Sequence, residues 1–403
     1  MGLRGEQDID VDSTVAGATA SRRAVVTGGV KLAGTAGLAM AAASATSLGV
    51  RRTFAQDATP GATPASNTST IGGVSVDPQM QEVLDALTSF NAPPIESTTP
   101  FNARNLPAFS NAVQQVLADR GEPALEPIGG VEHILVPGAE GDIVVRVYRP
   151  AQADDGPLPL LVYFHGGGFV IANLDVYDAA PRALANAAGC IVASVAYRLA
   201  PEAPFPCPVD DAYAATQFLF ANAATIGADP ARIAVGGESA GGNLATVVSI
   251  LARDQGGIAP LHQLLVYPVA TFAPAGEAAE SVTQFGDARP LNAAALQWFG
   301  SYYLPDPALA ADPSVSPLDS ADLTGLPPAT IILAEIDPLQ SQGRLYGEAL
   351  QAAGVEATVT LYEGVTHEFF GMGAVVDKAA DAVAEAAEAL QAAFDGGVAT
   401  PTA

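Results

Sequence analysis

The chain has 403 residues, of which 49% are apolar, and a formal net charge of −26. This length and apolar content are ample for one large α/β domain with additions. So acidic a surface repels nucleic acid and anionic membranes, and we expect neither as a partner.

Residues 1–55 resemble a twin-arginine export signal. Arg22 and Arg23 precede a weakly apolar run over 24–50, and the small residues that end at Ala55 offer a cleavage site. The run contains Lys31 and several glycines, so we expect no stable membrane span after signal removal. The sequence therefore predicts an exported protein, with an uncleaved N-terminal anchor as the alternative.

The next segments precede the main domain. Residues 56–76 have the composition of a flexible linker. Two amphipathic helices are expected over 79–90 and 106–119, separated by prolines, and together 77–125 would form an N-terminal cap. Residues 397–403 are expected to be a tail.

From residue 131 the pattern changes to short apolar strands. Segments 131–136 and 143–148 flank a glycine-containing turn, which predicts a β-hairpin. Further strands are expected at 158–164, 191–197, 232–236, 263–267, 329–334 and 358–362, and helices at 176–188, 208–224, 239–253, 340–353 and 375–394. Continuous apolar strands separated by helices predict an α/β domain over 126–396, with a mostly parallel sheet flanked by helices on both faces.

One insertion, at about 275–325, interrupts this alternation. Its four aromatic residues have a spacing that predicts one shared helical face, and they are Trp298, Phe299, Tyr302 and Tyr303. One interpretation is a plain core face. The other is a cap that closes over an apolar acyl group.

Cys190 opens a predicted strand, and Cys207 lies beyond the far end of that strand. The strand is about seven residues long and would place them roughly 20 Å apart along its direction. A disulfide requires Cα atoms within about 7 Å. We therefore expect two free thiols.

A glycine-rich turn follows the strand at 158–164 and reads His165-Gly166-Gly167-Gly168. With 4 His and 40 Gly in the chain, this motif is expected by chance roughly 0.004 times. Glycine lets the backbone approach a developing oxyanion, so the N–H groups of Gly167 and Gly168 are candidate donors. His165 and Gly166 are expected to support the turn.

A second motif, Gly237-Glu238-Ser239-Ala240-Gly241, lies between the strand at 232–236 and the next helix. Alone it is weak, but a serine on a sharp strand-to-helix turn is typical of a nucleophile. Gly237 and Gly241 supply the space that the turn needs, and the N–H of Ala240 is a third candidate oxyanion donor.

A serine nucleophile needs a base and an acid that orients the base. His367 follows the last strand at the carboxyl edge of the sheet, where open α/β sheets assemble their sites. Asp337 follows the preceding strand and is the candidate for the acid. Glu335 is the alternative acid, and it would lie farther back along the same strand. The chain order of Ser239, Asp337 and His367 is that of α/β-hydrolases, and these residues require no metal or cofactor.

These motifs resemble the hormone-sensitive-lipase-like family of α/β-hydrolases, which includes many bacterial carboxylesterases. The segments 197–202 and 210–213 also match that family, and the resemblance covers about 77–395. Two departures concern the site. Glu238 stands where the family usually has Asp or Thr, and Glu368 follows the histidine where Gly is common. They leave the triad intact and leave the substrate preference open.

The resemblance implies an α/β-hydrolase fold with a helical cap. It also implies a serine carboxylesterase that acts on small-molecule esters with short or medium acyl chains, through an acyl-Ser239 intermediate. The alternatives are a lipase, a deacetylase or an aryl formamidase with the same triad and, more remotely, a non-catalytic ligand-binding protein. No oligomeric state follows from the sequence.

Overall fold

A computed structural model describes residues 69–123, 126–153 and 156–396. The expected export signal, most of the expected linker and the expected tail lie outside the described residues. The described residues belong to one compact unit.

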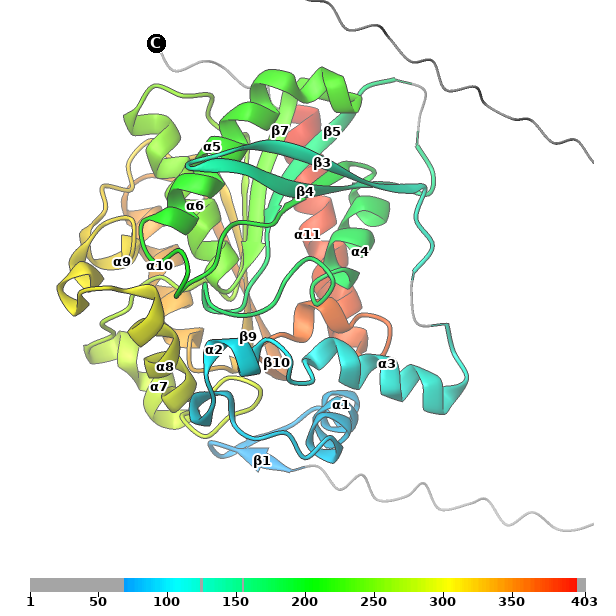
Figure 1. Cartoon of the computed structure of the whole chain (residues 1–403), viewed down its shortest axis with the longest axis vertical. Helices are drawn as coiled ribbons and strands as arrows, with labels where there is room; N and C mark the ends of the chain where they lie inside the picture. The colour runs from blue at the N-terminus through cyan, green and yellow to red at the C-terminus, as the bar shows by residue number, and fades with distance from the viewer. Residues whose placement is uncertain (1–68, 124–125, 154–155, 397–403) are drawn as a thin grey trace, which may run out of the picture. The chain divides into compact units, whose positions relative to one another are not determined.

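Eight strands of the described residues form one central sheet (Figure 1). Their order across the sheet is β10-β9-β8-β7-β5-β6-β4-β3. They are β3 (Gly130–Gly138), β4 (Gly141–Arg149), β5 (Leu158–Phe164), β6 (Ile191–Val195), β7 (Ala228–Glu238), β8 (Gln263–Val266), β9 (Ala329–Ile336) and β10 (Ala357–Thr366). β4 pairs antiparallel with both β3 and β6, and the other pairs are parallel. The predicted hairpin and the mostly parallel sheet are thus confirmed. A separate ribbon pairs β1 (Thr70–Ile71) with β2 (Val74–Ser75).

Helices cover both faces of the sheet. They are α4 (Ala179–Ala188), α5 (Cys207–Asn222), α6 (Ala240–Asp254), α10 (Gln340–Ala352) and α11 (Asp377–Gly396). Alternate strand residues enter different cores. In β5, Leu161 and Tyr163 pack with α4 and α11, whereas Leu160 and Val162 pack with α5, α6 and α10. No helix in the described ranges is long and apolar enough to cross a bilayer.

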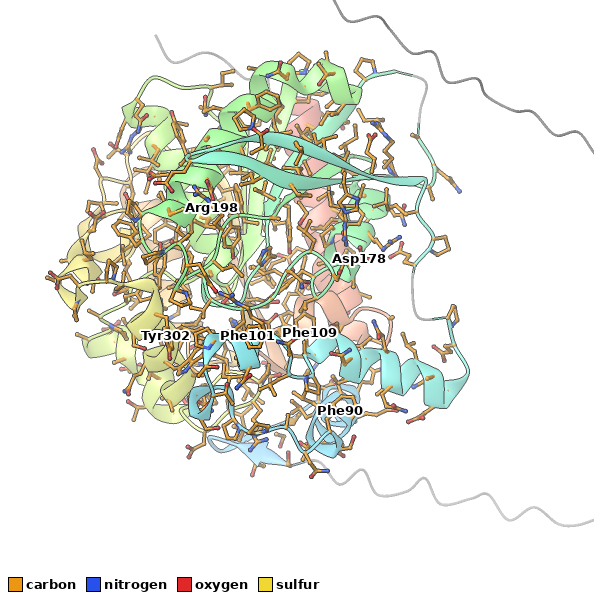
Figure 2. All side chains as sticks on the ribbon, viewed as in Figure 1. Phe90, Phe101, Phe109, Asp178, Arg198 and Tyr302 are labelled. Atoms are coloured by element: carbon orange, nitrogen blue, oxygen red, sulfur yellow. The ribbon has the colours of Figure 1, made fainter. Side chains whose placement is uncertain are left out.

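Two further segments gather beyond the carboxyl ends of the strands (Figure 1, blue to cyan and yellow). The first contains α1 (Pro78–Ser89), η1 (Ile95–Ser97), α2 (Pro100–Ala103) and α3 (Phe109–Arg120). The second contains η3 (Gly276–Ala279), α7 (Glu280–Gln284), α8 (Ala293–Tyr303), η4 (Pro307–Ala311) and α9 (Pro317–Ser320). We call these segments, 77–123 and 275–325, the cap. Phe101, Phe109 and Tyr302 mark them in Figure 2. The short helices η2 (Ala223–Ile226) and η5 (Phe369–Met372) lie outside the cap in the sequence.

Two hydrogen bonds join the two cap segments. Trp298 Nε1 of α8 donates to the carbonyl of Thr98 at 3.1 Å. Asn292 Nδ2, at the start of α8, donates to Glu96 Oε1 of η1 at 3.2 Å. The cap is therefore built from chain segments almost 200 residues apart that bond to each other.

Some predicted boundaries were wrong. The helix expected over 106–119 begins at Phe109, because Pro107 favours extended backbone in the preceding residue and Ala108 takes the cap position. The additional short helix α2 starts at Pro100, where Thr99 accepts the N–H of Asn102. The later start of α3 and the presence of α2 both follow from a proline at or just before the start of the helix.

Cys190 and Cys207 are free, as predicted. Cys190 is buried immediately before β6, and Cys207 is the first residue of α5.

Candidate active site

Ser239 occupies the turn between β7 and α6 with φ 56° and ψ −117°. Residues other than glycine rarely have positive φ, so the surrounding structure must hold Ser239 in this conformation. A Cβ on Gly241 would lie 1.9 Å from the carbonyl oxygen of Phe164, and one on Gly237 would lie 2.5 Å from it. Both glycines are therefore required for the sharp turn that presents Ser239.

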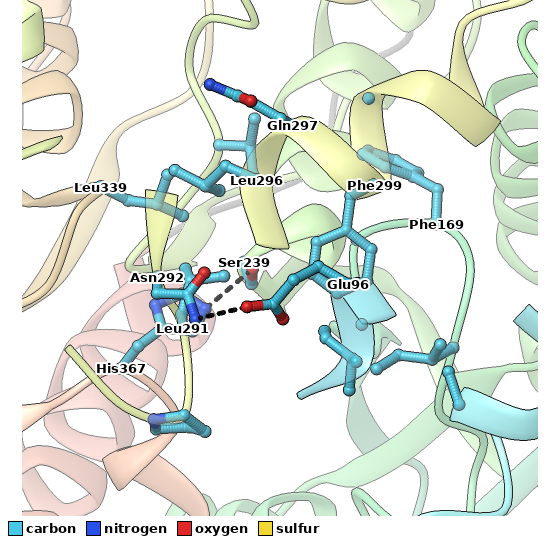
Figure 3. A pocket seen from close by; sticks show the side chains of 18 of the residues that line it. Glu96, Phe169, Ser239, Leu291, Asn292, Leu296, Gln297, Phe299, Leu339 and His367 are labelled. Carbon is cyan, nitrogen blue, oxygen red and sulfur yellow. Dashed lines mark hydrogen bonds between the residues drawn. The ribbon is translucent and has the colours of Figure 1, made fainter. Parts of the chain in front are cut away.

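The structure brings Ser239, His367 and Asp337 together in one hydrogen-bonded chain (Figure 3 shows Ser239 and His367). His367 Nε2 lies 3.0 Å from Ser239 Oγ, and Nδ1 lies 2.7 Å from Asp337 Oδ2. Asp337 Oδ1 accepts the N–H of Leu339 at 2.8 Å. With the proton on Nδ1, Nε2 is free to accept the serine proton, which is the geometry of a serine triad.

The surroundings of His367 favour its protonated form. Burial lowers its pKa, but the charge of Asp337 and the hydrogen bond to it raise the pKa and prevail, so that the net pKa is raised. An imidazolium that forms during reaction is therefore stabilised in place.

Glu335, the competitor for the acid position, points elsewhere. Its Oε2 accepts the N–H of Gly364 at 2.7 Å. Asp337, two residues later at the end of β9, is the carboxylate that reaches the imidazole.

The remaining histidines have other partners. Exposed His133 accepts a hydrogen bond from Arg146, and buried His262 lies 3.0 Å from Thr330 Oγ1. His165 is buried and stacks on Tyr197, with 4.5 Å between ring centroids, and burial lowers its pKa to about 4. Within the described ranges, no group of three or more His, Cys, Asp or Glu side chains is arranged to hold a metal ion.

The glycine turn lies beside Ser239. Gly167 (φ 102°) and Gly168 (φ 59°) line the same pocket as Ser239 and His367. A Cβ on Gly168 would lie 2.3 Å from the ring of Phe299, so this position requires glycine for space as well as for φ. The N–H groups of Gly167, Gly168 and Ala240 donate to no other group in the described part of the chain. These donors are free to meet an oxyanion.

The segment that matched the family, 197–213, supports the glycine turn. The hydroxyl of Tyr197 donates to the carbonyl of His165 at 2.7 Å. The Arg198 guanidinium donates twice to buried Asp211, at 2.7 and 2.8 Å, and Asp211 also accepts the backbone N–H groups of Arg198 and Ala139. These bonds tie the loop after β6 to α5 and to the β3–β4 turn, and the residues therefore have an architectural role.

A pocket of about 1010 Å³ contains Ser239 and His367 in its lining. Core and cap residues both form its walls (Figure 3). The apolar lining includes Phe109, Ile171, Val269, Leu291, Leu296, Phe299 and Leu339. A mostly apolar pocket at a nucleophile suits the hydrocarbon part of an ester.

The four aromatic residues of α8 do not share one role. Phe299 lines the pocket, but the other three do not. Tyr303 is fully buried and stacks on Phe169 at 3.9 Å between centroids, while Trp298 packs against Tyr302. The interpretation of one aromatic face over an acyl group is wrong for those three residues. Trp298 and Tyr302 diverge from Phe299 around the helix, and Tyr303, although on the same side as Phe299, packs in the core against Phe169.

A buried group of tyrosines around Glu238 was missed by the sequence reasoning. Glu238 is fully buried and accepts hydrogen bonds from the hydroxyls of Tyr163 and Tyr267. Burial and the nearby charge of Glu368 raise the pKa of Glu238 to about 8. The two tyrosines lie on strands β5 and just beyond β8, and no local motif connects them with Glu238.

Comparisons with known proteins agree with this fold. A family model for the alpha/beta hydrolase fold matches residues 161–371. The chain is 42% identical to carboxylesterase NlhH of Mycobacterium tuberculosis over 277 residues, covering 68% of this chain and 85% of NlhH. It is 40% identical to an ethyl acetate hydrolase of Pseudomonas putida over 250 residues, covering 61% of this chain and 77% of that protein. An esterase structure from Pyrobaculum calidifontis shares 37% identity with a TM-score of 0.70, covering 79% of this chain and 98% of that one.

The fold and site define a serine hydrolase of the α/β-hydrolase class that acts on carboxylic esters. The chain belongs to the hormone-sensitive-lipase-like family of carboxylesterases within that class.

Proposed function

We propose that this protein is an exported carboxylesterase that hydrolyses esters with short or medium acyl chains through an acyl-Ser239 intermediate. The observation that carries the proposal is the hydrogen-bonded chain from Asp337 through His367 to Ser239 at an apolar pocket.

In the acylation half, Ser239 Oγ attacks the ester carbonyl while His367 Nε2 takes the hydroxyl proton. The N–H groups of Gly167, Gly168 and Ala240 receive the negative oxygen of the tetrahedral intermediate. The intermediate then collapses. The bond to the alcohol oxygen breaks, and His367 transfers its proton to that oxygen.

In the deacylation half, a water molecule takes the place of the alcohol. His367 removes its proton, the hydroxide attacks the acyl carbon, and the bond to Ser239 breaks as the proton returns to Oγ. The products are a carboxylic acid and the regenerated serine.

The preference for short or medium acyl chains rests on two supports. A relative at 40% identity is named an ethyl acetate hydrolase, so the family includes activity on a very small ester. In addition, Phe299 and Leu291 bring apolar side chains of the insertion into the lining of the pocket that contains Ser239.

A series of p-nitrophenyl esters from acetate to palmitate tests the proposal, with Ser239→Ala as the matched variant. We expect the highest kcat/KM at short or medium chains and loss of hydrolysis in Ser239→Ala. Activity on long chains alone would identify a lipase instead. Unchanged hydrolysis in Ser239→Ala would contradict the assignment of the nucleophile, and inactivity of the folded protein on all chains would favour the amide-cleaving or binding alternatives.

Export is proposed from Arg22, Arg23 and the apolar run that follows them. In cells, replacement of both arginines by lysine should retain the protein in the cytoplasm, whereas the unchanged chain should appear outside it. Equal export of both forms would contradict a twin-arginine signal. N-terminal sequencing of the exported protein would locate the cleavage site expected after Ala55.

A further inference from the structure

A second carboxylate lies near Nε2 of the base, the ring nitrogen that also contacts Ser239. Glu368 directly follows His367 and lines the pocket, with 12% of its side chain exposed. Its Oε1 lies 3.9 Å from His367 Nε2, the nitrogen that protonates the departing alcohol in the proposed mechanism. That alcohol oxygen must come within about 3 Å of Nε2 and therefore lies no more than about 7 Å from Glu368.

The position of this carboxylate is fixed by a buried tyrosine. The hydroxyl of Tyr177 donates to both carboxylate oxygens of Glu368, at 2.6 and 2.7 Å. The same hydroxyl occupies the space where a Cβ on Gly166 would lie, only 2.3 Å away. Glu368 is thus held between the histidine loop and the glycine turn, with lone pairs remaining for a ligand.

Aromatic rings line the pocket next to this carboxylate. Phe109, at the start of α3, packs against the Tyr177 ring in an edge arrangement, with 5.4 Å between centroids. Both residues line the pocket, as does Glu368. A carboxylate beside aromatic rings is the chemistry that recognises an organic ammonium group, through charge and through cation–π contact.

The other charged side chains of the pocket lining leave this negative charge in place. Arg104 is paired with Glu202 and donates to the carbonyls of Val170 and Ala200. Arg289 is exposed, and Glu96 adds a further negative group. Burial and the charge of Asp337 raise the pKa of Glu368, whereas His367 and the hydrogen bond from Tyr177 lower it.

We infer that Glu368, Tyr177 and Phe109 form a subsite for the alcohol part of the ester, and that this subsite favours alcohols carrying a positively charged ammonium group. The inference rests on the proposed function, because it places the leaving alcohol by the role of His367. Glu368 is a specificity-determining residue in this account, and the apolar part of the lining, which includes Val269, Leu291 and Phe299, is left for the acyl group.

Two esters of the same shape test the subsite in the full-length protein: acetylcholine, whose alcohol is cationic, and 3,3-dimethylbutyl acetate, its neutral counterpart. We expect Glu368→Gln to lower the ratio of their kcat/KM values about tenfold relative to the unchanged protein. The glutamine keeps an oxygen for Tyr177 and removes the charge. Glu335→Gln, in which the altered carboxylate lies outside the pocket lining, should leave the ratio unchanged.

If Glu368→Gln still hydrolyses both esters and the ratio of their kcat/KM values is unchanged, the inference is overturned. Failure of the proposed function would look different, because neither ester would be hydrolysed, or hydrolysis would survive in Ser239→Ala.

If Glu368→Gln does not fold, inhibition of the unchanged protein provides the test. Tetramethylammonium should inhibit hydrolysis of the neutral ester at lower concentration than tert-butanol, and equal inhibition would overturn the inference. Phe109→Leu should weaken inhibition by the cation.

Discussion

At the scale of single residues, the turn that carries Ser239 depends on glycines, which have no side chain to clash with neighbouring backbone. Ser239 has a backbone conformation that costs about 1–3 kcal/mol outside glycine. It is compatible with the fold because Gly237 and Gly241 let α6 approach the end of β5. The sequence motif identifies these glycines, and the distances give the steric reason.

Gly241→Ala tests that reason. Because its Cβ would lie 1.9 Å from a backbone oxygen, the backbone must shift, and we expect the free energy of unfolding to fall by about 1–3 kcal/mol. Esterase activity should fall as well, since Ser239 moves with the turn. Urea denaturation measures the first effect. Gly396→Ala is the control, because its Cβ would meet no atom within 4 Å, and equal stability of the two variants would contradict the steric account.

Asp337→Asn tests the choice between two neighbouring acids. The amide cannot fix the tautomer of His367 or balance its positive charge, so kcat should fall by about 10³–10⁴-fold. Glu335→Gln should retain most activity, because Glu335 contacts Gly364 and not His367. Steady-state kinetics on a neutral ester compares the two, and a larger loss in Glu335→Gln would reverse the assignment.

The pH dependence follows from the pKa of His367. Only neutral imidazole can accept the serine proton, so activity falls as pH drops through that pKa. Since the pKa is raised, the fall should occur above the ordinary value of about 6.5. A profile of kcat/KM on a neutral ester from pH 4.5 to 9 measures it. Activity that is flat down to pH 4.5 would exclude His367 as the base.

At the scale of elements, strand periodicity predicted the sheet well because buried parallel strands are short, continuous apolar runs. β5 matches its predicted bounds over 158–164. The cap was predicted less well, since its short helices are set by prolines and by contacts with distant residues. Trp298, for example, is oriented by Thr98, which lies 200 residues earlier.

The hydrogen bond from Trp298 to the carbonyl of Thr98 should hold the two cap segments together around the pocket. Trp298→Phe removes the donor, and we expect a rise in KM of roughly fivefold, with a smaller change in kcat, from loss of about 1 kcal/mol. Tyr302→Phe is the matched control, since Tyr302 packs on Trp298 but its hydroxyl has no hydrogen-bond partner within the described ranges. Equal effects of both variants on KM would argue for packing alone.

At the scale of the whole molecule, the site combines the carboxyl edge of one sheet with two distant cap segments. Chain order and edge position were sufficient to predict that Ser239, Asp337 and His367 lie together, because parallel strands end at the same edge. They were not sufficient for Tyr177 and Glu368, which are 191 residues apart and meet only through the folded loops. No motif or period links two such positions.

The central claim is that Ser239 attacks the ester and carries the acyl group. The most direct measurement is mass spectrometry of the protein after reaction with diethyl p-nitrophenyl phosphate, a reagent that leaves a stable phosphoryl group on an activated serine. We predict one added diethylphosphoryl group per chain, on the peptide that contains Ser239, with loss of esterase activity in parallel. Modification of a different residue, or full activity after Ser239 is modified, would contradict the account.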